Sequence, residues 1–208
     1  MKMNSYFSST LIMKNLLTPL FIACLLFAGS LFAQQHLAFK GVPIDGSLQA
    51  YTNAMVKAGF HYEGTQDGIA ILSGDFAGYK NCLVGVSTLK NCDVVSHIAV
   101  LFPAKETWSS LRGDYETLKS MLTEKYGYPS DSRERFHADY IDNSSSNTAI
   151  MLALHNDQCE WYSTFTTDLG RLELSIVPGS DHDEGMVRLS YYDKANSEKV
   201  RSSAIDDL

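Results

Sequence analysis

The sequence lacks the short motifs by which most hydrolases and metal proteins are recognised. No GxSxG segment is present, and none of the six histidines lies in an HExxH or similar spacing that would set two metal ligands on one helix. No two cysteines have CxxC spacing, and the glycine-rich pieces GDFAG and GTQDG lack the form of a phosphate-binding loop. We therefore expect no catalytic constellation, no metal site and no cofactor.

Positive charge is also scarce. The 208 residues carry 17 Lys and Arg against 24 Asp and Glu, for a formal net charge of −7, and no Lys/Arg cluster occurs. An acidic chain without a basic stripe is a poor ligand for nucleic acid or anionic lipid. With 45% hydrophobic residues the composition is that of a globular protein with a buried core. Partners are therefore expected among proteins, glycans or small molecules, and not among nucleic acids.

The first part of the chain has the features of a secretory signal peptide over residues 1–33. An apolar run from Leu16 to Phe32 follows a lysine, and cleavage is expected after Ala33. An uncleaved membrane anchor and a lipoprotein lipidated at Cys24 are the alternatives, although the apolar run continues past that cysteine. We expect a mature protein of residues 34–208, in the periplasm or secreted, with no stable membrane span after signal cleavage.

The stretch from Ile69 to Phe102 predicts three consecutive antiparallel strands. It is rich in β-branched residues and is interrupted by Gly74, Gly78 and the polar cluster at residues 90–93. Side chains of a strand alternate between two faces. One face should therefore carry two apolar sets, which are Cys82, Val84 and Val86 in the second strand and Val94, Ile98, Val100 and Phe102 in the third.

The pairing of these two sets makes a prediction about the loop between them. If both share one face, the numbers of opposed residues sum to an even value, which predicts a three- or five-residue loop around Lys90 and Asn91. In that register Cys82 lies several pairs away from Cys92, too far for a disulfide. In an oxidising compartment one pair among Cys82, Cys92 and Cys159 could bridge, and Cys82 is expected to be a small buried apolar residue.

Two helices are predicted to cover this sheet. Ser47 is a suitable N-cap for a helix over residues 48–58 that ends at Gly59. A longer helix is expected from Thr107 to Tyr126, in which Gly113 could mark a break in the first turn. Its apolar residues recur every three or four positions and form one stripe, namely Trp108, Leu111, Tyr115, Leu118, Leu122 and Tyr126.

The remaining segments are predicted to be mostly strands. A turn is expected at residues 64–68, Asp193 should cap a short C-terminal helix, and Asp168-Leu169-Gly170 should close a tight hairpin. The strands are expected at Arg133–Tyr140, Thr148–His155, Cys159–Thr166, Arg171–Val177 and Met186–Tyr192.

Together these elements predict an α+β fold: a curved antiparallel β-sheet with helices packed on one face. The order helix, strands, helix, strands suggests two tandem helix-plus-meander units. We expect residues 34–208 to form a single domain with pseudo-repeat halves 34–103 and 104–208.

Two groups of residues are candidates for binding. The strand aromatics Trp161, Tyr162, Tyr191 and Tyr192 occur as adjacent pairs, so one member of each should face outwards. A row of exposed aromatics would form a protein- or glycan-binding face, and the alternative is that a second helix or sheet layer covers them. The polar run 180–185 is predicted to be a solvated loop, with a bound cation as the alternative. Cys159 is an unpromising nucleophile because acidic residues flank it.

Several segments resemble a family of uncharacterised exported (periplasmic) proteins of Bacteroides-like bacteria. They are GVPIDGSL, KAGF, SGDFAGY, IAVLFP, TWSSLRGDYETLKSMLTEKYGYP and VRLSYYDKAN, and they span nearly the whole mature chain. The expected layout also looks like the β-lactamase inhibitory protein and small outer-membrane assembly lipoproteins. The resemblance implies a fold and export but assigns no functional residue.

We therefore expect an exported non-enzymatic binding domain that acts on a protein or cell-envelope component. The alternatives are a small-molecule or glycan-binding protein and a cryptic hydrolase. An open aromatic sheet face would favour the first function, and a deep cleft holding His and carboxylates would favour the hydrolase.

Overall fold

The computed structural model describes residues 36–89, 92–137 and 141–206. The expected signal peptide, residues 1–33, lies outside these ranges. Within them the strands are β1 (Ala38–Phe39), β2 (Val42–Pro43), β3 (His61–Gln66), β4 (Ile69–Phe76), β5 (Tyr79–Thr88), β6 (Val95–Leu101), β7 (Asp131–Phe136), β8 (Cys159–Thr167), β9 (Gly170–Pro178) and β10 (Gly185–Asp193). The helices are α2 (Leu48–Lys57), α3 (Trp108–Tyr126), α4 (Asn147–His155) and α5 (Lys194–Asp206).

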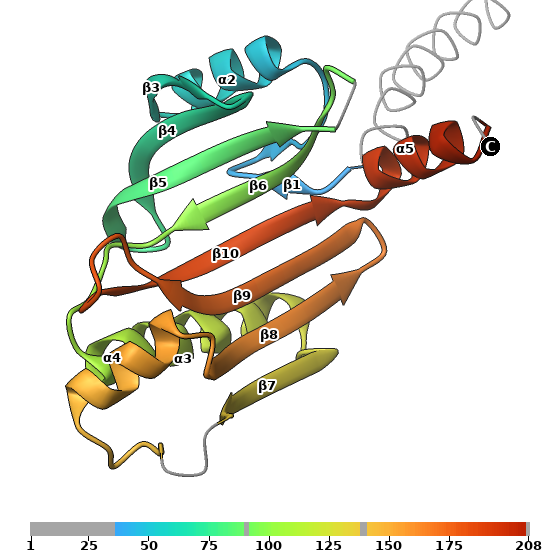
Figure 1. Cartoon of the computed structure of the whole chain (residues 1–208). Coiled ribbons are helices and arrows are strands. Elements are labelled where there is room, and N and C mark those ends of the chain that lie inside the picture. Colours follow the sequence, from blue (N-terminus) through green and yellow to red (C-terminus); the bar gives the residue numbers. More distant parts are fainter. Residues whose placement is uncertain (1–35, 90–91, 138–140, 207–208) are drawn as a thin grey trace, which may run out of the picture. The chain divides into compact units, whose positions relative to one another are not determined.

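Eight strands form one curved antiparallel sheet in the order β3-β4-β5-β6-β10-β9-β8-β7 (Figure 1). Each half of the chain contributes a four-stranded meander, and the last strands of the two meanders, β6 and β10, pair at the centre. Their register sets Ile98 opposite Tyr191 and His97 opposite Tyr192. The fold is therefore α+β, as the sequence predicts.

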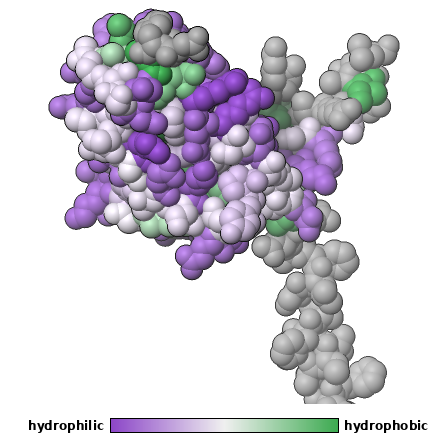
Figure 2. Space-filling model, turned by 90° about the horizontal axis from the view of Figure 1, so that it is seen from below, coloured by the Kyte–Doolittle hydropathy of each residue, from purple (hydrophilic) through white to green (hydrophobic). Residues whose placement is uncertain are grey.

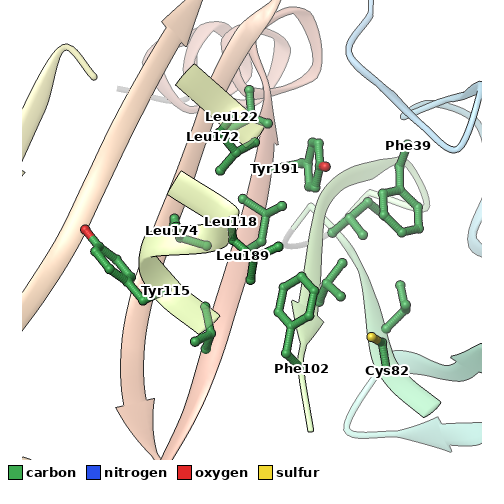
Figure 3. Close-up of a cluster of buried hydrophobic side chains, with 14 of the residues drawn as sticks. Phe39, Cys82, Phe102, Tyr115, Leu118, Leu122, Leu172, Leu174, Leu189 and Tyr191 are labelled. Atoms are coloured by element: carbon green, nitrogen blue, oxygen red, sulfur yellow. The ribbon is translucent and has the colours of Figure 1, made fainter. Parts of the chain in front are cut away.

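The helices cover one face of this sheet. Helix α2 packs on β5, whereas α3 crosses β8, β9 and β10 and α4 lies beside it (Figure 1). The predicted stripe of α3 is buried, except that Tyr126 is half-buried. Leu118 lies beside Leu174 and Leu189 (Figure 3), and the Tyr115 hydroxyl lies 2.7 Å from the Ser163 hydroxyl on β8. Gly113 does not break this helix, which is continuous from Trp108.

The caps of the two predicted helices also agree with the sequence. The Ser47 hydroxyl accepts a hydrogen bond from Ala50 N at 3.2 Å, and Gly127 has a φ of 86° after the last residue of α3. Only a residue without a Cβ adopts that conformation at little cost, so Gly127 ends the helix.

The buried carboxylate of Asp193 links the start of the described chain to the beginning of the C-terminal helix. Asp193 is fully buried, and its two carboxylate oxygens accept hydrogen bonds from Leu37 N at 2.7 Å and Asn196 N at 2.9 Å. His36 Nδ1 lies 3.0 Å from the same carboxylate. Asp193 is thus the N-cap of α5, as expected, and also anchors the segment before β1.

The register of β5 and β6 is as predicted, but the predicted length of the loop between them is wrong. Leu83 pairs with Leu101 and Val86 with Ile98, so opposed numbers sum to an even value and both apolar sets face the helices. A bulge between Ser87 and Thr88 then shifts the pairing, and residues 89–94 separate the two strands. The extra residue of the bulge turns an odd loop into an even one and buries Val95 in place of Val94.

Three other segments differ from the predictions. The strand expected at Arg133–Tyr140 is β7, which begins at Asp131 and ends at Phe136, and residues 138–140 lie outside the described ranges. Residues 147–155 are helix α4 instead of a strand, with Ser146 as N-cap, because a short continuous apolar run carries no period that separates the two states. The turn expected over residues 64–68 is confined to Asp67 and Gly68, which have φ values of 50° and 79°. Gly64 lies in β3, next to a bulge.

Candidate binding face

On the side of the sheet opposite the helices, no described residue forms a second layer over the central strands, and we call this side the open face. It faces the viewer in Figure 1, where α3 lies behind β8 and β9. Because side chains alternate, the register places on it the residues between the core positions of each strand.

Over β4, β5 and β6 the open face is aliphatic. Leu83 is 45% exposed and Ile69 37% exposed, and Ile71, Ala99 and Leu101 lie beside them, half-buried. We call these five residues the aliphatic patch. At its centre Gly85 pairs with both Ile71 and Ala99, and the Ile69 side chain lies close to it.

Over β7 to β10 the same face is charged. Arg133 and Arg135 reach the two oxygens of Glu160 at 3.3 Å and 3.2 Å. Arg188 lies 3.8 Å from Glu173, its neighbour on the adjacent strand. The open face therefore has an aliphatic half and a half in which arginines and carboxylates alternate.

A stack of three planar groups crosses the strands near the end of β10. The Tyr192 ring lies between the His97 imidazole, at a centroid separation of 4.6 Å and an angle of 18°, and the Arg171 guanidinium, 4.5 Å from the ring centroid. Cross-strand pairing of β6, β10 and β9 sets these residues in one row. Both faces of Tyr192 are thus occupied, so its ring is not a platform on which a sugar could stack.

The environment of His97 keeps it neutral. Burial, followed by the positive charges of Arg188 and Arg171, lowers the pKa of His97 to about 4. Its Nδ1 lies 3.4 Å from the Ser87 hydroxyl, and its Nε2 is buried without a hydrogen-bond partner among the described residues.

The structure divides the four aromatic candidates between the two sides of the sheet. Trp161 packs edge-on against Trp108 at 4.9 Å, and Tyr191 against Phe39 at 5.5 Å, so both are core residues and not part of a binding face. Tyr162 and Tyr192 lie on the open face, half-buried. The aliphatic patch, His97 and Arg171 were missed as candidates. The alternation of β4 and β5 placed Ile71 and Leu83 opposite the core, and it was the available signal for the patch.

The other polar candidates give no reactive centre. Burial raises the pKa of the Cys159 thiol to about 12, the opposite of what a nucleophilic cysteine needs. His155 Nε2 lies 2.9 Å from the carbonyl oxygen of Glu184, in the predicted loop. Among the described residues, no three His, Cys, Asp or Glu side chains gather as metal ligands would.

Comparisons with known proteins identify no relative of this chain. No family model matches it, and neither a curated protein nor a solved structure matches its sequence or fold. The resemblance to exported proteins of Bacteroides-like bacteria therefore depends on the quoted segments alone. In the part of the chain that the structure describes, no helix is both long enough and apolar enough to cross a bilayer.

Proposed function

We propose that this chain is an exported, non-enzymatic binding domain whose open face engages a protein partner of the cell envelope. The observation that supports this proposal is the aliphatic patch on an uncovered sheet. Leu83 and Ile69 expose large apolar side chains beside the Gly85–Ala99 pair, next to a half rich in paired charges. Apolar centres with charged surroundings are typical of protein interfaces.

A protein suits this face better than a glycan does. Sugar binding uses the free face of an aromatic ring, and Tyr192 has both faces occupied. The Tyr162 hydroxyl donates to Asp131 at 2.9 Å, which ties that side chain to the neighbouring strand. A protein partner needs only apolar area and matched charges, and both are present.

The test is a pull-down from periplasmic and outer-membrane fractions with the tagged full chain. Leu83→Asp places a charge in the patch, and Met121→Asp places the same charge at an equally exposed position (47%) on α3. We expect Leu83→Asp to lose the captured protein and Met121→Asp to retain it. Equal capture by both variants would show that the patch is not the interface.

Export has its own test. Amino-terminal sequencing of the protein purified from its native host should begin at Gln34, because cleavage is expected after Ala33. A protein that begins at a lipidated Cys24, or that retains residues 1–33, would contradict the proposed signal peptide.

A further inference from the structure

A cleft lies where the β8–β9 hairpin meets the first turn of α5. Its volume is about 430 Å³, and its walls include Thr166 and Arg171 from the strands and Lys194 and Ser197 from the helix. Tyr192 and Asp193 line it where β10 ends. It is continuous with the open face, since Arg171 and Tyr192 belong to both.

Arg171 is an exposed cationic side chain of this cleft. Its guanidinium lies against the Tyr192 ring, which in turn stacks on His97, so one face of the guanidinium is packed. Because Arg171 is exposed, the edge of the guanidinium is accessible to solvent. Arg133, Arg135 and Arg188 each have a carboxylate partner on the open face. In the described part of the chain Arg171 has none.

The single acidic residue of the cleft does not supply that partner. Asp193 is fully buried, and its oxygens are occupied by Leu37 N, Asn196 N and His36 Nδ1. Lys194 is exposed at the other wall. The cleft thus combines two cationic side chains with a carboxylate whose oxygens are already occupied by hydrogen bonds within the protein.

We propose that this cleft binds a carboxylate, presented by an acidic side chain of the protein partner, through the edge of the Arg171 guanidinium. A planar, stacked guanidinium offers paired N–H donors that match the two oxygens of a carboxylate. Two amides at the start of α5 are already bonded, Asn196 N to the Asp193 carboxylate and Lys194 N to the Leu169 carbonyl, which makes this helix end a poor cradle for phosphate. The nature of the ligand as a polypeptide depends on the proposed function, whereas carboxylate binding by itself does not.

The test is an NMR titration of the folded protein with two peptides, Ac-Ala-Glu-Ala-NH₂ and its uncharged isostere Ac-Ala-Gln-Ala-NH₂. We expect the Glu peptide to shift the Arg171 Nε–H signal and the amides of Thr166 and Ser197 saturably, with a Kd in the millimolar range, roughly 1–10 mM. The Gln peptide should leave them in place. Equal shifts with both peptides would contradict the proposal, and so would tighter binding of inorganic phosphate than of the Glu peptide.

Variants separate this site from general surface charge. Arg171→Gln should weaken binding of the Glu peptide about tenfold, whereas Arg112→Gln, at a half-buried arginine of α3 paired with Glu116, should leave it unchanged. Equal loss in both variants would contradict the proposal. Leu83→Asp should retain peptide binding, so carboxylate binding in the cleft is tested independently of partner binding at the aliphatic patch. If Arg171→Gln does not fold, the shift of Arg171 Nε–H in the wild type decides by itself.

Discussion

The imidazole of His97 lies flat on the phenol ring of Tyr192, with the two ring planes only 18° apart. This contact joins the two halves of the chain on the open face, because His97 lies in β6, the last strand of the first meander, and Tyr192 lies in β10, the last strand of the second. It also contributes to the burial of a titratable ring near two arginines, and this environment disfavours the protonated imidazole.

We expect His97 to make the protein sensitive to acid. Its folded-state pKa of about 4 is below the unfolded value of 6.5, so between these values the unfolded chain binds a proton that the folded chain does not. The stabilisation from neutral His97 is therefore complete above pH 6.5 and is lost as the pH falls toward 4, by on the order of 2–3 kcal/mol. His97→Phe keeps a flat ring and should lose less free energy of unfolding between pH 7 and pH 4.5 than the wild type.

Urea denaturation at the two pH values measures this difference. His61→Phe is the control, because His61 is exposed on β3. It should show the same loss as the wild type. A loss for His97→Phe as large as that of the wild type would mean that His97 titrates normally in the folded protein.

Truncation of Leu118 should test the packing of α3. Leu118 is 2% exposed and faces Leu172 and Leu189 (Figure 3), so Leu118→Ala should lower the free energy of unfolding by about 2–5 kcal/mol. Met121→Ala removes a side chain of similar size that is 47% exposed on the same helix, and should cost about 1 kcal/mol or less. Similar losses of free energy of unfolding for the two variants in urea melts would contradict the packing of the Leu118 face of α3 on the sheet.

Two glycines should respond in opposite ways to the same substitution. Gly113 lies inside α3 with open space where a Cβ would stand, so Gly113→Ala should stabilise the protein by about 0.5–1 kcal/mol. Gly170 has a φ of +155°, and a Cβ there would lie 2.2 Å from the carbonyl oxygen of Tyr192. Gly170→Ala should therefore lower the melting temperature sharply while Gly113→Ala raises it; the same sign for both would contradict these environments.

The cysteines should differ in their rates of alkylation. Cys92 is exposed, Cys159 is half-buried with its pKa raised to about 12, and Cys82 is fully buried. Iodoacetamide at pH 8 should therefore label Cys92 first, Cys159 slowly and Cys82 only after unfolding, as read by peptide mass spectrometry. A Cys82–Cys92 crosslink in the non-reduced map would contradict the register of β5 and β6.

Elements with one covered face were predictable from the sequence. Leu172 and Leu174 in β9 alternate with Arg171, Glu173 and Ser175 because the helices cover one side of the sheet. The stripe of α3 was predictable for the same reason. Helix α4 was not, since Ile150, Met151, Ala153 and Leu154 are all buried and leave little alternation. Its signals were the N-cap Ser146 and the helix-forming Ala, Met and Leu residues that follow.

The candidate site was less predictable than the fold. Tyr192 was identified as a strand aromatic, but its neighbours His97 and Arg171 are set by strand pairing between distant parts of the chain. No local pattern indicates that β6 pairs with β10. For that reason the sequence identified aromatic residues one by one, while the structure shows a continuous row across three strands.

The central pairing of β6 with β10 also has a consequence for how the chain folds. Ile98 and Tyr191 are opposed although the whole second meander separates them in sequence. During synthesis the first meander is complete long before β10 exists, and until then β6 is an unpaired edge with a fully apolar side. Contacts of such long sequence separation form slowly. The joining of the two meanders is therefore expected to be the late, rate-limiting event of folding, and β6 the strand by which an incomplete chain would aggregate.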